Sequence, residues 1–405
     1  NTGTLNVTGG TLNYSSGTGS STGAVNIASG TTWQTGGGSM VFAAGSTLTN
    51  AGTLLSSNGS TTIAEASAFT GGISLSGGTL TVDAATSVAG VFAQSGGTLA
   101  GSGNLTLNAV GNTWSSGTWT GSGTTTLDTG ASFTASGTTT STVFAGRTLT
   151  INGGASATFN GDIELETGSS AITNAGTLTL TGTRLSHFFN NPGTLDLSNT
   201  GTLIKSGAGS YELGSVNLNN TGTLNVTGGT LNYSSGTFSQ NGLIQVASGA
   251  TFQKSGGFTN AAIGTISGSG TIDVGAGNTL TNQGNLKPGG TGVAGTLSIT
   301  GNLDNSGTIE AEIGGTTAGT QYDVIAVSGN VTLGGGTLNS TLINSFVPAG
   351  QSFDMIAAGG TASGSFTTLN LPPGVNGAIV GNVFRLTHSG ACAGICWDGG
   401  AGTLN

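Results

Sequence analysis

A short unit, Gly-Thr-Leu followed by alternating polar and apolar residues, recurs along most of this chain. Its first copy, at positions 3–7, reads Gly-Thr-Leu-Asn-Val. Side chains alternate in an extended chain, so Leu5 and Val7 share one face and the polar residues share the other. Gly-Gly, Ser-Gly or Asn-Gly steps follow most copies, which lets the chain turn after each short strand. The pattern predicts an all-β fold, a parallel β-helix (β-solenoid) of about twenty short coils.

Helices are not expected anywhere in the chain. Gly and the β-branched residue Thr interrupt every stretch in which apolar residues recur at helical spacing. Asn and Thr at equivalent positions of successive coils can instead stack into hydrogen-bonded ladders. We therefore expect many of the polar residues to be structural.

The chain also contains an internal duplication that is much longer than the short repeat. The segment 1–18 recurs without change at 220–237, and the similarity extends over 1–38 and 220–257. Core positions in the two copies exchange one apolar residue for another, as Trp33 does for Phe252. Duplication thus lengthened the solenoid without requiring a site in each copy.

The repeat texture divides the chain into three parts. Gly-Thr-Leu coils dominate residues 1–315. Longer apolar strands and three of the five prolines fall in 316–390, which we interpret as a terminal β-rich segment that closes the solenoid. Residues 391–405 contain two Cys and a Trp and form a tail that could be donated as a strand to another copy. The chain starts at Asn1 rather than Met, which predicts that it is processed or excised from a longer protein.

Charge is scarce and excludes several classes of partner. Only 5% of the 405 residues are charged, the net charge is −9, and the six Lys and Arg residues are scattered. Without a basic patch we expect no binding of nucleic acid. No apolar run approaches the roughly 20 residues of a membrane-spanning helix, so we expect no membrane span.

One acidic cluster invites a metal interpretation. Asp162, Glu164 and Glu166 alternate along the chain, so their carboxylates share one face of a strand and could hold calcium. The simpler interpretation is a solvated outer face, with Ile163 and Leu165 pointing inward.

Enzymatic activity is not expected. Glu310 and Glu312 repeat the acidic pattern in a shorter form, and no cation lies near either cluster in the sequence. Polysaccharide-cleaving enzymes with this fold need clustered carboxylates, often together with Arg or Lys. We expect no catalytic residues and no cofactor, with calcium as the one exception left open.

Two cysteines near the end of the chain suggest a local disulfide. Cys392 and Cys396 are close enough in sequence to close a small loop in an exported protein. His388 precedes them at a spacing that would suit a zinc site on a helix. Gly390 and Gly394 disfavour a helix there, so the disulfide is the preferred interpretation.

The tryptophans leave a glycan-binding surface open. Trp33 aligns with an apolar residue in the duplicate and is expected in the core. Trp114, Trp119 and Trp397 could be core residues or a platform on which sugar rings stack. Flat Thr arrays would instead suggest ice binding, but the spacing of the Thr residues is too irregular to favour it.

The most specific resemblance lies in the second half of the chain. Two groups of motifs carry it, namely Tyr322-Asp323-Val324-Ile325, Phe346, Pro348, Gly350, Phe353, Gly364-Ser365-Phe366 and Leu371-Pro372, followed by Trp397-Asp398-Gly399-Gly400-Ala401-Gly402. With the coils, these motifs resemble secreted bacterial β-solenoid proteins, which include filamentous-haemagglutinin-like adhesins and autotransporter passenger domains. The resemblance implies a secreted protein at the bacterial cell surface, with an adhesive or scaffold role.

Taken together, these features predict an extracellular structural protein, the subunit of a fibre, sheath or surface layer. Its expected partner is a second copy, joined head to tail through the terminal strands. The residues expected to make that contact are Thr2, Thr4, Leu5, Asn6, Trp397, Thr403, Leu404 and Asn405. The alternative function is an adhesin that binds an extracellular glycan.

Overall fold

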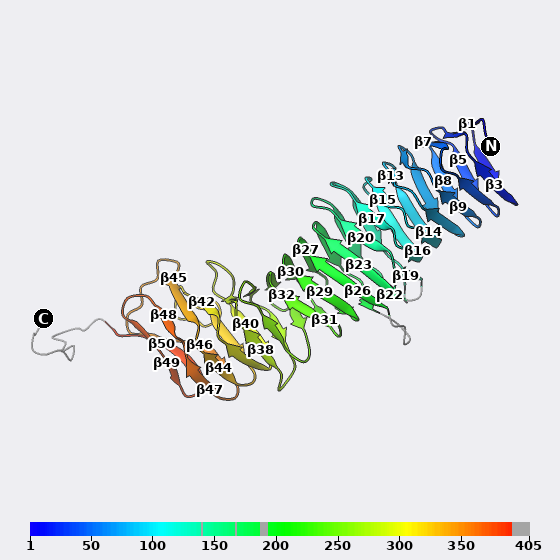
Figure 1. The fold of residues 1–405 in the computed structure, drawn as a ribbon. Helices are drawn as coiled ribbons and strands as arrows, with labels where there is room; N and C mark the ends of the chain where they lie inside the picture. Colours follow the sequence, from blue (N-terminus) through cyan, green and yellow to red (C-terminus); the bar gives the residue numbers. More distant parts are fainter. Residues whose placement is uncertain (139–140, 167, 187–192, 391–405) are drawn as a thin grey trace, which may run out of the picture. The chain divides into compact units, whose positions relative to one another are not determined.

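The computed structural model describes residues 1–138, 141–166, 168–186 and 193–390. All regular structure in these ranges is β-strand, and no helix there could span a membrane. The chain divides into two compact units, residues 1–239 and 240–405. Each unit is a stack of short coils, and Figure 1 shows the strands of successive coils lying side by side within each unit.

Three strands make one coil at the start of the chain, where each strand pairs in parallel with the strand three places later in the chain. In the first coil Thr4 lies opposite Ala24, Thr11 opposite Thr32 and Thr18 opposite Ser39. The strands of the first two coils are β1 (Thr4–Val7), β2 (Thr11–Tyr14), β3 (Thr18–Ser21), β4 (Ala24–Ile27), β5 (Thr32–Thr35) and β6 (Ser39–Phe42). The sheets stacked on β1, β2 and β3 are the first, second and third walls of the unit.

The first wall of the first unit continues with β7 (Thr47–Asn50), β10 (Ser67–Phe69), β13 (Thr86–Val88), β15 (Leu105–Leu107), β17 (Thr124–Leu127), β20 (Thr148–Ile151), β23 (Ser169–Asn174), β26 (Thr194–Asn199) and β29 (Val216–Asn220). In the second unit the first wall contains β35 (Phe258–Asn260), β38 (Thr279–Asn282), β41 (Asn302–Asn305), β44 (Val331–Gly334) and β47 (Ala362–Ser365). The second wall of that unit contains β33 (Leu243–Val246), β36 (Thr265–Gly268), β39 (Asn285–Pro288), β42 (Thr308–Ile313), β45 (Thr337–Leu342) and β48 (Thr368–Asn370).

The solenoid confirms the predicted fold class but has fewer turns than the expected twenty, because the first wall consists of β1, β4 and β7 together with a sheet of fourteen strands that runs from β10 to β47. The cause is the length of the turns. Thr4 pairs with Ala24 in the next coil, whereas Leu338 pairs with the much more distant Leu369. Longer corners use up chain without adding turns.

Alternation places the core as the sequence predicts. In β30 (Thr223–Val226), Leu224 and Val226 are buried while Thr223 and Asn225 remain partly exposed. The same alternation of buried and partly exposed positions recurs in most strands of both units. Inward Leu, Ile, Val and Phe side chains from successive coils therefore form a continuous core within each unit.

Buried asparagines form the polar part of the core. In the first unit the last residues of β23, β26 and β29 stack, and Asn174 Nδ2 donates to Asn199 Oδ1 at 2.8 Å while Asn199 Nδ2 donates to Asn220 Oδ1 at 2.7 Å. In the second unit Asn260, Asn282 and Asn305 repeat this arrangement, with bonds of 2.8 and 2.6 Å. These chains are Asn ladders of the predicted kind.

The segment 316–390 begins with further coils of the same type. β43 (Val324–Val327) pairs in parallel with β46 (Ser352–Ala358), and β45 pairs in parallel with β48. Among the strands that the structure describes, antiparallel pairing appears only near the end, where β46 and β49 (Val375–Val380) both pair with β50 (Val383–His388).

Candidate functional site

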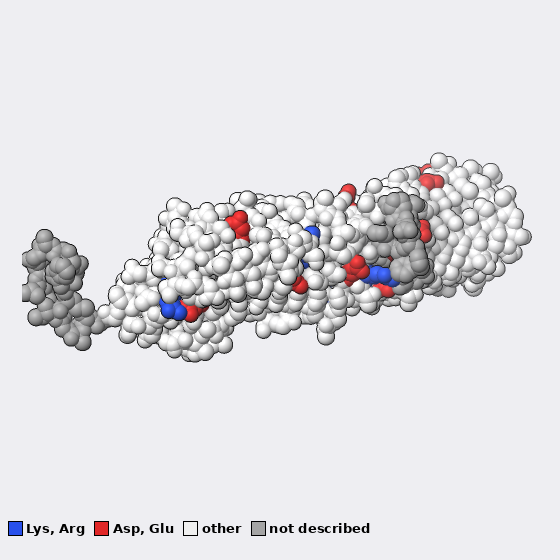
Figure 2. Space-filling model, turned by 90° about the horizontal axis from the view of Figure 1, so that it is seen from below, with Lys and Arg blue, Asp and Glu red and all other residues white. Residues whose placement is uncertain are grey.

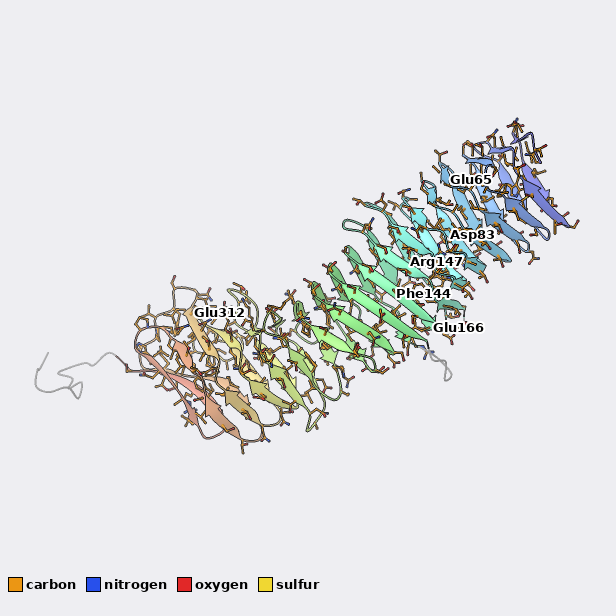
Figure 3. All side chains as sticks on the ribbon, viewed as in Figure 1. Glu65, Asp83, Phe144, Arg147, Glu166 and Glu312 are labelled. Atoms are coloured by element: carbon orange, nitrogen blue, oxygen red, sulfur yellow. The ribbon has the colours of Figure 1, made fainter. Side chains whose placement is uncertain are left out.

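The acidic cluster lies on β22 (Ile163–Leu165) in the first unit. Ile163 and Leu165 are buried, as expected for inward positions. Glu164 is also nearly buried, and burial raises the pKa of its carboxyl, with Glu166 adding to the rise and Arg184 opposing it. Glu166 is labelled in Figure 3. The face is therefore less solvated than the sequence suggests.

A cation absent from the local sequence completes this cluster. Arg184, in β25 (Arg184–Ser186), lies in the next coil because β22 pairs with β25, and its Nε is 3.9 Å from Asp162 Oδ2. The Thr183 hydroxyl also donates to Asp162. Among the described residues, no three His, Cys, Asp or Glu side chains come together where one metal ion could bind. Arg184 and Thr183 therefore engage Asp162, and calcium binding stays a prediction.

The second acidic pair is likewise engaged by the chain. Glu310 Oε2 lies 2.7 Å from Lys287 Nζ, and Glu310 Oε1 accepts a bond of 2.7 Å from Asn285 Nδ2. Glu312 Oε1 accepts the backbone N–H of Gly292 at 2.6 Å. Each carboxylate thus holds a residue from the preceding coil.

The described tryptophans lie in the core and form no sugar platform. Trp33, Trp114 and Trp119 are buried, and the rings of Trp114 and Trp119 stack with centroids 4.5 Å apart. Their indole N–H groups find partners inside the protein, Trp119 with Gln94 Oε1 at 2.7 Å and Trp114 with the Gly117 carbonyl at 3.1 Å. Trp397 lies outside the described residues.

Two of the described cations are buried and bond to neutral oxygens of the chain. The first is Arg147, labelled in Figure 3, which donates to Thr125 Oγ1 at 2.8 Å and to the carbonyls of Gly101 and Gly103 at 3.3 and 3.1 Å. Burial lowers the pKa of Arg147 to about 10. Because its partners lie one and two coils earlier, Arg147 ties three coils together. This is a structural clamp that sequence inspection did not find.

Lys205 is the second buried cation. It occupies the last, inward position of β27 (Thr202–Lys205), and its Nζ donates to the carbonyls of Ser206, Gly207 and Gly228 at 2.8, 2.9 and 3.1 Å. Burial lowers the pKa of this amine. The sequence does contain a signal for this burial. The alternation of side chains in β27 assigns position 205 to the inward face, although the residue there is a lysine.

Asp323 is the buried acid of the second unit. Its Oδ1 accepts the Gly295 N–H at 2.7 Å and its Oδ2 accepts the Glu312 N–H at 2.8 Å. Burial raises the pKa of Asp323 to about 8, although the two backbone bonds favour the ionised form. Asp323 therefore joins the segment before β40 (Thr296–Thr300) to β42.

A surface groove of about 420 Å³ lies on the second wall of the second unit. Gln245, Ser267 and Lys287 line it from the adjacent strands β33, β36 and β39. Ile263 and Gly290 line it from the loops that precede β36 and follow β39. Charged side chains are few on the face of the molecule drawn in Figure 2. Within the groove, Lys287, one of the six Lys and Arg residues of the chain, lies beside the neutral polar residues Gln245 and Ser267.

The residues predicted to mediate assembly are only partly described. Thr2, Thr4 and Asn6 are exposed, and Leu5 is partly buried where β1 pairs with β4. Asn6 Oδ1 accepts a bond of 2.8 Å from Asn26 Nδ2. The other predicted contact residues, Trp397, Thr403, Leu404 and Asn405, lie outside the described residues.

The predicted disulfide and the zinc alternative also fall at the end of the chain. Cys392 and Cys396 lie outside the described residues. His388 is described, and its Nδ1 accepts the Gly350 N–H at 3.2 Å. This bond ties β50 to the loop before β46.

No protein-family model and no curated protein matches the chain. The all-β solenoid fold therefore rests on the structure itself. The relation to adhesins and autotransporter passengers rests on the motifs described above and enters below as a proposal.

Proposed function

We propose that this chain is an extracellular structural protein that assembles head to tail into a fibre, sheath or surface layer. The secreted location is supported by the motifs that resemble secreted bacterial β-solenoids. A structural role is supported by the interior, where backbone pairing along three walls, apolar packing and Asn ladders join each coil to the next. The buried groups Arg147, Lys205 and Asp323 all bond to the chain itself.

The observation that carries the assembly proposal is the exact duplication of the segment 1–18. The second copy lies inside the first unit, where β30 pairs in register with β27 and β31 (Thr230–Tyr233) pairs with β28 (Ser210–Leu213). Its Leu231 is 0% exposed, whereas the identical position in the first copy, Leu12, is 38% exposed. The same sequence therefore stacks beneath a preceding coil when one is present.

A coil stacked on β2, which we propose that a second copy supplies, would cover Leu12 on the second wall much as the preceding coil covers Leu231 on the third wall. Such a contact extends the parallel pairing and, being heterologous and unclosed, propagates as a filament. The free energy comes from the apolar side chain and from the strand edges of β1, β2 and β3, which within the described residues pair only with β4, β5 and β6.

Sedimentation velocity over a range of concentrations, with negative-stain images of the same samples, tests the proposal. The full chain should form polymers with an axial repeat, and Leu12→Lys should remain monomeric because it places a charge in the contact. Asn13→Lys is the matched control, since Asn13 is the exposed neighbour on the opposite face of the strand. A strictly monomeric full chain at high concentration would refute assembly.

A further inference from the structure

The groove on the second wall of the second unit has a floor of aligned polar side chains. Gln245 lies opposite Ser267, and Ser267 lies opposite Lys287, so the three form a column across β33, β36 and β39. Neighbouring strands in a sheet are about 4.8 Å apart. A ligand lying along this column meets a new polar group at each strand, a spacing comparable with the length of one sugar ring in an extended glycan.

The strands that form the floor of the groove have only their side chains free to contact a ligand. β36 pairs on one side with β33 and on the other with β39, and β39 pairs in turn with β42. Backbone amides and carbonyls of these two strands are therefore engaged within the sheet. A peptide cannot add here as an extra strand, which removes the commonest way in which a sheet binds a polypeptide.

The chemistry of the floor suits a neutral ligand rich in hydroxyl groups. Gln245 is exposed and supplies donors and acceptors, Lys287 supplies further donors, and the Ser267 hydroxyl between them lines the groove although Ser267 is only 6% exposed. The charge of Lys287 is balanced by Glu310, whose Oε2 lies 2.7 Å from Nζ. With Glu312 close by on the same strand, the surroundings would repel an acidic glycan rather than attract it.

One side of the groove is held in place before any ligand binds. Gly290 and Thr291 line the groove from the loop between β39 and β40. Glu312, labelled in Figure 3, holds this loop through the Gly292 N–H at 2.6 Å, and Asp323 holds its end through the Gly295 N–H at 2.7 Å. A loop fixed in advance lowers the entropy that binding must overcome.

Apolar groups complete the lining. Ile263 is 78% exposed, and Leu243 also lines the groove. Sugar rings present apolar C–H faces between their hydroxyl groups, so exposed aliphatic side chains beside a polar column match both parts of a pyranose.

We propose that this groove binds an extended neutral polysaccharide, with sugar hydroxyls on the column of Gln245, Ser267 and Lys287 and ring faces on Ile263. The site is separate from head-to-tail assembly, because none of the residues that line the groove is among those predicted to make the assembly contact. It would let a structural solenoid hold a matrix or cell-wall glycan along its side.

The test uses the full chain and an array of neutral hexasaccharides of glucose, mannose, xylose and N-acetylglucosamine, with hexagalacturonate as the acidic probe. At least one neutral hexasaccharide should bind, and it should bind better than hexagalacturonate. Calorimetry with the best binder then compares variants. Thr265→Tyr, which fills the groove, should weaken binding by about tenfold or more, which corresponds to about 1.4 kcal/mol.

Thr308→Tyr is the matched control, because Thr308 occupies the same position two strands further along the wall and lies outside the groove. It should bind like the unaltered chain. Lys287→Gln provides a second groove variant, expected to weaken binding several-fold should the tyrosine variant fail to fold. Failure of every neutral probe, preference for hexagalacturonate, or equal weakening by Thr265→Tyr and Thr308→Tyr would overturn the proposal.

Discussion

Replacing Asn199 by Leu removes the middle of the Asn ladder in the first unit. Asn199 Oδ1 accepts from Asn174 Nδ2, and Asn199 Nδ2 donates to Asn220 Oδ1 and to the Thr223 carbonyl at 3.0 Å. Leu should fit the position, because the preceding coil has buried Ile151 opposite Asn174. The perturbation therefore changes hydrogen bonding more than volume.

The expected loss follows from the partners left behind. Asn174 Nδ2 loses one of its two acceptors and keeps the Thr202 carbonyl, while Asn220 Oδ1 loses a donor, and the two losses together cost roughly 2–4 kcal/mol. Burial of the larger apolar side chain returns roughly 2 kcal/mol. We expect Asn199→Leu to lower the free energy of unfolding by up to about 2 kcal/mol.

A second substitution should restore stability. The double variant Asn174→Leu, Asn199→Leu has no Asn174 side-chain amide left to lose its acceptor. It should therefore be more stable than Asn199→Leu alone. Asn50→Leu is the matched single control. Asn50 is buried and donates to the Gly72 carbonyl at 2.9 Å, but its Oδ1 has no hydrogen-bond partner in the described structure. The control should therefore lose much less stability than Asn199→Leu.

Guanidinium unfolding followed by tryptophan fluorescence measures these differences, because Trp33, Trp114 and Trp119 are all buried in the first unit. Midpoints of the transition should fall most for Asn199→Leu. Equal midpoints for Asn199→Leu and Asn50→Leu, or a double variant whose loss is the sum of those of Asn174→Leu and Asn199→Leu, would show that the ladder does not couple neighbouring coils.

Three further predictions test other parts of the structure. Leu224→Asp should cost roughly 3–5 kcal/mol in thermal unfolding, because it buries a carboxyl in the core, and Thr223→Asp should be mild; equal tolerance would reverse the assigned faces. The folded chain holds the Asp323 proton up to about pH 8 while the unfolded chain releases it near 3.8, so the unfolding free energy should fall as pH rises between these values. Asp323→Asn should remove that fall, and an unchanged pH profile would contradict the raised pKa. Chelation with EDTA should leave the unfolding temperature unchanged, since Arg184 lies beside Asp162, and a loss of several degrees would restore the calcium interpretation.

The candidate sites show where inference from sequence stops. The sequence shows Asp162 and its neighbours as an acidic cluster but does not show Arg184 as their partner. Arg184 lies one full coil later in the chain, and only the pairing of β22 with β25 brings it beside Asp162. The sequence leaves Trp114 and Trp119 open between core and surface, and only their burial and the packing of one ring against the other place both in the core. The groove gave no sequence signal, because its polar column takes one residue from each of three strands.

The sequence by itself determined the fold class and the inward and outward faces. Side chains on a strand alternate with a period of two whatever the strand pairs with, so Leu224 points inward from its place in the Gly-Thr-Leu unit alone. Only the tertiary structure decided which residues of different coils meet. The length of chain between paired positions differs from coil to coil, as the pairs Thr4 with Ala24 and Leu338 with Leu369 show, and it depends on how each corner closes. The clamp of Arg147, the anchoring of Gly295 by Asp323 and the column of the groove all depend on that register.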